Sequence, residues 1–106
     1  EWAEHVPAVP DYLGRPNVVG RLPGAGGGRS LILCAHIDTV EVGDPAQWSH
    51  DPLGGEVVDG DLFGRGACDM KAGLVTNLFA LLALREAGFD PAGDVTLHSV
   101  ISEEDG

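Results

Sequence analysis

Basic residues are scarce in this sequence, and their scarcity limits the partners that the protein can have. The 106 residues include 6 Lys and Arg against 17 Asp and Glu, which gives a formal net charge of −11. A surface of this sign repels nucleic acid and anionic membranes, so we expect neither as a partner. The acidic residues are scattered rather than gathered in one block, so an acidic tail does not account for the charge. Most of them keep the protein soluble, and a few are candidates for holding cations.

Long apolar runs and a leader segment are also lacking. No apolar run approaches the roughly 20 residues that span a bilayer, and the N-terminus has no basic, apolar leader. The two cysteines, Cys34 and Cys68, are too few for a disulfide scaffold and are interpreted as reduced thiols. These features predict a cytoplasmic protein. Because the sequence starts at Glu1 rather than Met, a lost leader stays an open alternative.

Apolar residues make up 43% of the sequence, which is enough for a core, and the length fits one domain at most, residues 1–106. Hydrophobic periodicity and turn residues divide this domain into ordered segments. They predict strands at 18–22, 30–35 and 95–101, a hairpin with strands at 56–58 and 61–63, and a helix at 72–87. Asp59 and Gly60 between the hairpin strands suit a type I′ turn.

The order of these segments predicts the fold class. A strand, a long helix and a second strand form a βαβ crossover, so the strands at 30–35 and 95–101 should run parallel. The helix carries apolar residues on a wide surface, so we expect it to be covered on most sides. The sequence therefore predicts an α/β fold with a mostly parallel, twisted sheet and covering helices.

Residues that bind metals or move protons follow both central strands. His36 and Asp38 stand at the end of the first strand, and Glu103 and Glu104 follow the second. The carboxyl ends of the strands are where open α/β sheets place their sites, and Asp69 precedes the helix between them. His36 and Asp38 are two residues apart in extended chain, so the carboxylate can orient an imidazole that binds a metal. The alternative is that these two residues end a strand by chance.

Two further patterns have alternatives of their own. Glu103 and Glu104 are neighbours in an extended segment and should point to opposite sides, one toward a metal and one toward a bound water as general base. An ordinary acidic turn is the alternative. Asp69 can instead cap the helix N-terminus, and Cys68 beside it is a possible thiolate ligand, although packing is the more common role of a single cysteine.

Taken together, these patterns resemble one family. The segments that carry the resemblance are residues 33–40 (LCAHIDTV), 48–52 (WSHDP), 64–73 (GRGACDMKAG) and 102–106 (SEEDG). They are similar to the family of metallohydrolases that includes acetylornithine deacetylase, succinyl-diaminopimelate desuccinylase and glutamate carboxypeptidase. The similarity runs from about residue 17 to the end, and the joint spacing is far more specific than any single segment.

The resemblance implies a role for each candidate residue. His36 would bind one metal, Asp38 would orient His36, and Asp69 would bridge the two metals. The resemblance also implies that the Asp69–Met70 peptide bond is cis. Glu103 would be the general base, and Glu104 would bind the second metal. The cofactors would be two divalent ions, zinc above all, with cobalt or manganese as alternatives. The reaction would be hydrolysis of an amide bond in an N-acyl amino acid or small peptide.

Two departures from the family pattern bear on these expectations. Ala72 stands where many members have glycine, a change that we expect to be neutral. More importantly, the family's further carboxylate and histidine ligands, and the lid domain that forms its dimers, are absent from 106 residues. The resemblance therefore implies the N-terminal portion of a catalytic domain, inactive alone. The alternatives are a non-catalytic fragment with an incomplete site and a different two-zinc aminopeptidase.

Overall fold

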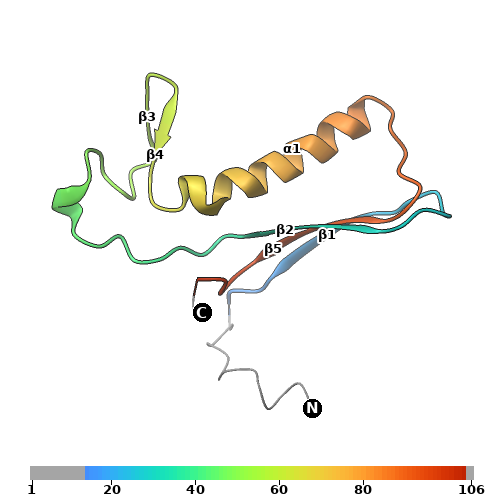
Figure 1. The fold of residues 1–106 in the computed structure, drawn as a ribbon, viewed down its shortest axis with the longest axis horizontal. Coiled ribbons are helices and arrows are strands. Elements are labelled where there is room, and N and C mark those ends of the chain that lie inside the picture. Colours follow the sequence, from blue (N-terminus) through green and yellow to red (C-terminus); the bar gives the residue numbers. More distant parts are fainter. Residues whose placement is uncertain (1–13, 105–106) are drawn as a thin grey trace, which may run out of the picture.

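The computed structural model describes residues 14–104, which form a small α/β unit with two layers (Figure 1). One layer is a three-stranded sheet of β1 (Val18–Leu22), β2 (Leu31–His36) and β5 (Val95–Val100), and helix α1 (Ala72–Glu86) lies along one face of it. A separate hairpin of β3 (Glu56–Val58) and β4 (Asp61–Phe63) stands beside the start of the helix. A short 3₁₀ helix, η1 (Pro45–Gln47), lies in the long loop after β2.

The three-stranded sheet is mixed rather than mostly parallel. β5 is the central strand, in the order β1-β5-β2. It pairs parallel with β2, as the βαβ crossover predicts, but antiparallel with β1. β5 lies between β1 and β2 in the sheet. Asp94, just before β5, forms hydrogen bonds with the end of β1 and with the loop that follows it. Its Oδ1 accepts the Gly24 N–H at 2.9 Å and its Oδ2 accepts the Arg21 Nε–H at 3.0 Å.

The hairpin agrees with its prediction from the sequence. β3 and β4 pair antiparallel with Val58 opposite Asp61, which leaves Asp59 and Gly60 as the two turn residues. Both have positive φ, 53° and 95°. A type I′ turn requires positive φ at these two positions, so the Asp-Gly pair explains why the chain reverses there.

Helix α1 begins after an irregular turn, η2 (Ala67–Lys71), and ends at a glycine. Gly88 follows the helix with φ 76°, and the Phe89 N–H donates to the Leu84 carbonyl at 2.9 Å, which closes the last turn. Inside η2, the Asp69–Met70 peptide bond is cis, as the resemblance implied. The last two residues of the fourth motif, 105 and 106, lie outside the described residues.

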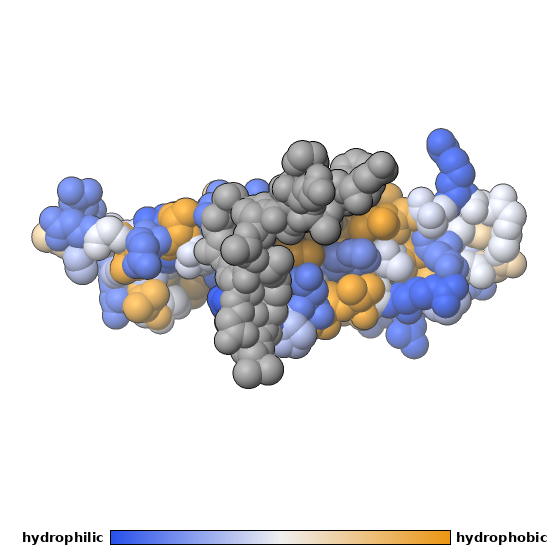
Figure 2. All heavy atoms as spheres, turned by 90° about the horizontal axis from the view of Figure 1, so that it is seen from below, coloured by the Kyte–Doolittle hydropathy of each residue, from blue (hydrophilic) through white to orange (hydrophobic). Residues whose placement is uncertain are grey.

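The expectation that the helix is covered on most sides is wrong for this chain. Phe79 is 62% exposed and Val75 is 51% exposed, because among the described residues the layer against α1 is one face of a three-stranded sheet. The buried apolar core among the described residues is correspondingly small and consists of Ala35 and Val95. Figure 2, which views the molecule from below, also shows hydrophobic patches between polar ones on that face. The chain therefore presents much apolar surface.

One stretch is longer and more apolar than its sequence pattern led us to expect. Residues Ala67–Glu86 are long and apolar enough to cross a membrane, by length and composition only. This is weak evidence for a membrane segment, because the core helix of a soluble protein has the same properties. Here the helix lies against β2 and β5.

Candidate metal centre

His36 is the centre of the candidate site and ends strand β2. It is 5% exposed, and its Nε2 lies 3.1 Å from Asp69 Oδ1 and 3.8 Å from Glu103 Oε2. Its other nitrogen, Nδ1, lies 3.1 Å from the backbone carbonyl oxygen of Asp38. Because a carbonyl oxygen can only accept, Nδ1 carries a proton and donates it there. Nε2 is therefore the nitrogen that faces the acidic side chains.

Asp38 lies between His36 and the segment that carries the two glutamates. Its Oδ1 lies 3.5 Å from His36 Nδ1, too far for a good hydrogen bond, and is buried without another hydrogen-bonding partner in the described residues. Its Oδ2 accepts the backbone N–H of Glu104 at 2.9 Å. The carboxylate thus links the strand that carries the histidine to the segment that carries the glutamates.

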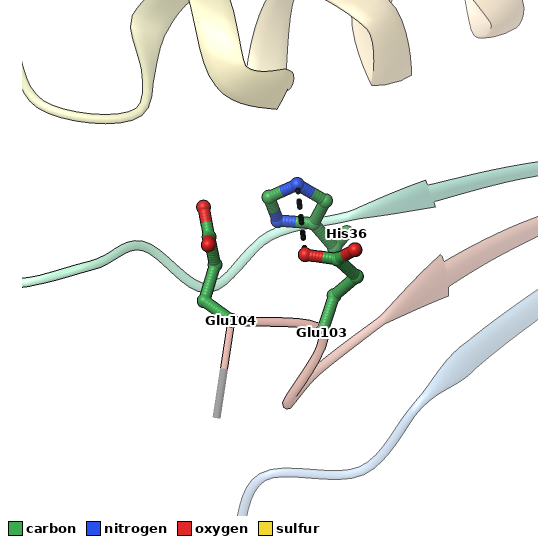
Figure 3. Close-up of side chains that lie close together, drawn as sticks. All are labelled: His36, Glu103 and Glu104. Atoms are coloured by element: carbon green, nitrogen blue, oxygen red, sulfur yellow. Dashed lines mark ion pairs between the residues drawn. The ribbon is translucent and has the colours of Figure 1, made fainter. Parts of the chain in front are cut away.

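Glu103 and Glu104 point to the same side, which corrects the expectation that they point to opposite sides. Ligand atoms of His36, Glu103 and Glu104 all lie within 4.8 Å of one another. Figure 3 shows both glutamate side chains rising from the segment after β5 toward the histidine. The segment is not extended, because Ser102 has a left-handed φ of 64°. This turn changes the alternation of side chains that an extended chain would impose.

Asp69 reaches the same histidine from η2. Its side chain is 79% exposed, and it lies outside the tightest group formed by the other three residues. No side-chain hydrogen bond caps η2 or α1, so the alternative that Asp69 serves as a helix cap is wrong. Cys68 is exposed and is not in the group of candidate metal ligands among residues 14–104.

The charges of the site agree with a cation-binding role. Burial lowers the pKa of His36, but its contacts with the Asp38 carbonyl, the Asp69 carboxylate and the Glu103 charge outweigh burial and hold the pKa above 6.5. Burial raises the pKa of Asp38, and backbone N–H groups, led by that of Glu104, outweigh it and hold the pKa below 3.8.

Asp69 and Glu103 both pair with the imidazole of His36 in the described part of the chain. One imidazole nitrogen with several carboxylate oxygens is a donor set for zinc, manganese or cobalt. The residues present therefore fit a divalent metal.

An apolar groove lies beside this site but is separate from it. Its volume is about 660 Å³, and it is lined by residues of the hairpin, the loop before it and the first turns of α1, among them Leu53, Phe63 and Val75. None of the five predicted site residues lines it. The polar cluster therefore marks the candidate site, and the groove is part of the apolar surface described above.

Two residues that support the site have no signature in the sequence. Asn17 Oδ1 accepts the backbone N–H of Ile101 at 2.9 Å, just before the two glutamates. Ser102 supplies the left-handed turn. Neither has a local signal, because Asn17 is 84 residues away from its partner and serine is not a residue that favours positive φ.

An imidazole and carboxylates gathered at the carboxyl ends of two parallel strands define an α/β domain with a candidate metal site. Comparison with known proteins then specifies the family. A family model described as Peptidase family M20/M25/M40 matches residues 32–106. The chain belongs to this family, which confirms the membership expected from the four motifs.

Curated relatives support the same assignment. The chain is 46% identical over 97 residues to the N-formyl-4-amino-5-aminomethyl-2-methylpyrimidine deformylase of Bacillus subtilis (strain 168), covering 90% of this chain and 23% of that protein. It is 42% identical over 77 residues to the succinyl-diaminopimelate desuccinylase of Rhodospirillum centenum, covering 73% of this chain and 20% of that protein. These relatives are amide hydrolases. The chain spans about a quarter or less of their length.

Proposed function

We propose that this chain is the N-terminal portion of the catalytic domain of a metal-dependent amidohydrolase. The observation that carries the proposal is the convergence of His36, Asp69, Glu103 and Glu104, which come from three separate elements of the fold. Membership of a family whose enzymes are generally metal-dependent supports it. Family membership also favours this proposal over the alternative that the protein is a different two-zinc aminopeptidase.

In this proposal, His36, Asp69 and Glu104 would hold two divalent metal ions, and Asp69 would be the ligand that the two ions share. Zinc fits best, and cobalt and manganese take similar nitrogen and oxygen donors. When bound, such ions supply Lewis acidity that lowers the pKa of water and polarises a carbonyl group. The backbone carbonyl of Asp38 keeps the proton on Nδ1 of His36 and so directs Nε2 toward the acids.

Glu103 is the residue that we assign to proton transfer. Its carboxylate is 59% exposed and lies on the His36 side of the segment, where it can reach a water molecule. As general base it takes a proton from the attacking water, and as general acid it passes that proton to the nitrogen of the leaving amine. The products are a carboxylic acid and an amine, so the bond that breaks is an amide.

The substrate that we propose is an N-acyl amino acid or a small peptide. The names of the relatives, a deformylase and desuccinylases, support a small acyl group on nitrogen. In a full-length protein of the relatives' size, later residues would supply the remaining metal ligands and the lid domain through which we expect a homodimer to form. We propose a cytoplasmic location, with neither nucleic acid nor membrane as a partner.

Metal analysis together with amide substrates tests this function in the full-length protein. We expect about two equivalents of zinc per chain and turnover of acyl-amino acids or dipeptides that stops when a chelator removes the metal. A full-length protein that binds no divalent metal, or binds it without hydrolysing any member of the panel, would support the rival interpretation of a non-catalytic protein.

A further inference from the structure

The two glutamates are carried by a short turn, residues 101–104, which we call the glutamate turn. It follows β5 directly, so its position depends on where that strand ends and on what holds the turn beyond the sheet. A flexible turn would let the carboxylates of Glu103 and Glu104 separate, because like charges repel when no cation lies between them. The structure nevertheless has both near His36.

Two side chains from outside the turn fasten its ends. Asn17 Oδ1 accepts the N–H of Ile101 at the first end, and Asp38 Oδ2 accepts the N–H of Glu104 at the other, each at 2.9 Å. Asn17 precedes β1, whose Val18 pairs with Ser99 of β5, so the antiparallel register brings Asn17 beside the start of the turn. The N-terminal strand thereby reaches the candidate site without contributing a ligand.

Between these two anchors, Ser102 sets the direction of the glutamates. Its φ of 64° is left-handed, a conformation that is unfavourable for a residue with a Cβ atom relative to the right-handed one. The two flanking hydrogen bonds act on either side of this residue. They stabilise the left-handed conformation of Ser102, and this conformation places the carboxylates of Glu103 and Glu104 on the same side of the turn.

We propose that Asn17 and Ser102 are positioning residues of the metal centre, which act through the glutamate turn and touch neither metal nor substrate. The inference rests on the proposed function, because the turn has a metal to position only if the centre binds one. Asn17 needs only its acceptor oxygen for this role, and Ser102 needs only its left-handed backbone.

Zinc affinity of the full-length protein, measured by competition with a chromophoric chelator, tests the inference. Asn17→Ala removes the acceptor, and we expect about three- to tenfold weaker zinc binding, since one of the two hydrogen bonds that hold the turn is lost. Asn17→Asp keeps an acceptor oxygen and should bind zinc as tightly as the wild type or tighter. Asn77→Ala is the matched control, because Asn77 lies on α1 and its side chain forms no hydrogen bond among the described residues, so affinity should be unchanged.

A second pair of variants examines Ser102 in the same assay. Glycine adopts positive φ readily, whereas a β-branched residue resists it. We expect Ser102→Gly to keep wild-type affinity and Ser102→Val to weaken it at least as much as Asn17→Ala does. Absorption bands of the cobalt-loaded protein should change in Asn17→Ala and Ser102→Val only, because they report the arrangement of ligands rather than stability.

The outcomes separate this inference from the proposed function. If Asn17→Ala binds zinc as tightly as the wild type, or if Asn17→Asp loses as much affinity as Asn17→Ala, the positioning role of Asn17 is refuted. If Ser102→Val binds like Ser102→Gly, the role of the left-handed turn is refuted. A wild-type protein that binds no zinc would instead refute the proposed function, and this inference with it.

Discussion

Gly66 is a position at which one added methyl group should destabilise the fold next to the candidate site. It is buried at the start of η2, three residues before Asp69, and its φ is 78°. A Cβ atom built there would collide with Cγ2 of Thr39 and would lie 2.7 Å from Nζ of Lys71. Lys71 can move the end of its flexible side chain, but Cγ2 of Thr39 is attached directly to Cβ and can turn away only with the whole side chain.

The cost of Gly66→Ala has two parts that a control can separate. The left-handed conformation alone should cost about 1–2 kcal/mol for alanine, and forcing a methyl group into occupied space should cost about 1–3 kcal/mol more. Gly88 has nearly the same φ, 76°, and a Cβ atom added there would meet no other atom within 4 Å. Gly88→Ala should therefore show the conformational cost without the collision.

Thermal unfolding of the full-length protein measures both costs. With about 1–2 °C of midpoint per kcal/mol for a protein of the relatives' length, we expect Gly66→Ala to lower the midpoint by about 1–6 °C more than Gly88→Ala does. Thr39→Ser removes the colliding methyl group, so the double variant Gly66→Ala with Thr39→Ser should recover most of that difference. Equal midpoints for the two single glycine variants, or no recovery in the double variant, would refute the steric argument.

Three further predictions concern the site, the sheet and the isolated chain. Glu103→Ala should lower the turnover of the full-length protein by about 10²–10⁴-fold with near-normal metal content, whereas Glu104→Ala should lose one metal; equal metal loss in both would refute the division of roles. The Gly24 N–H and the Arg21 side chain hold the pKa of Asp94 below 3.8, so its carboxylate stabilises the fold above that pH and loses this effect as the pH falls through its folded pKa. Asp94→Asn should therefore destabilise the protein in urea unfolding at neutral pH and much less in strong acid, and a constant difference would contradict this. The 106-residue chain alone should show no turnover with zinc, because zinc sites need about three protein ligands each, and steady turnover would mean that ligands have been missed.

The sequence by itself determined the local elements of this protein. Hydrophobic runs located β1, β2, β5 and α1 to within a residue or two, and Asp59-Gly60 located the hairpin turn. It also indicated which residues meet, because parallel strands on either side of a crossover helix end at the same edge of a sheet. His36 and the two glutamates follow from that rule without any knowledge of the coordinates.

Tertiary structure alone decided how those elements are combined. The pattern of β1 does not reveal that β5 inserts beside it and pairs antiparallel, because periodicity specifies a buried face and not a partner. Alternation in an extended chain predicted opposite directions for Glu103 and Glu104, and the left-handed turn at Ser102 overruled it. That turn is held by Asn17 and Asp38, which are distant in sequence, so the positions of both carboxylates depend on hydrogen bonds that form only once the sheet has assembled.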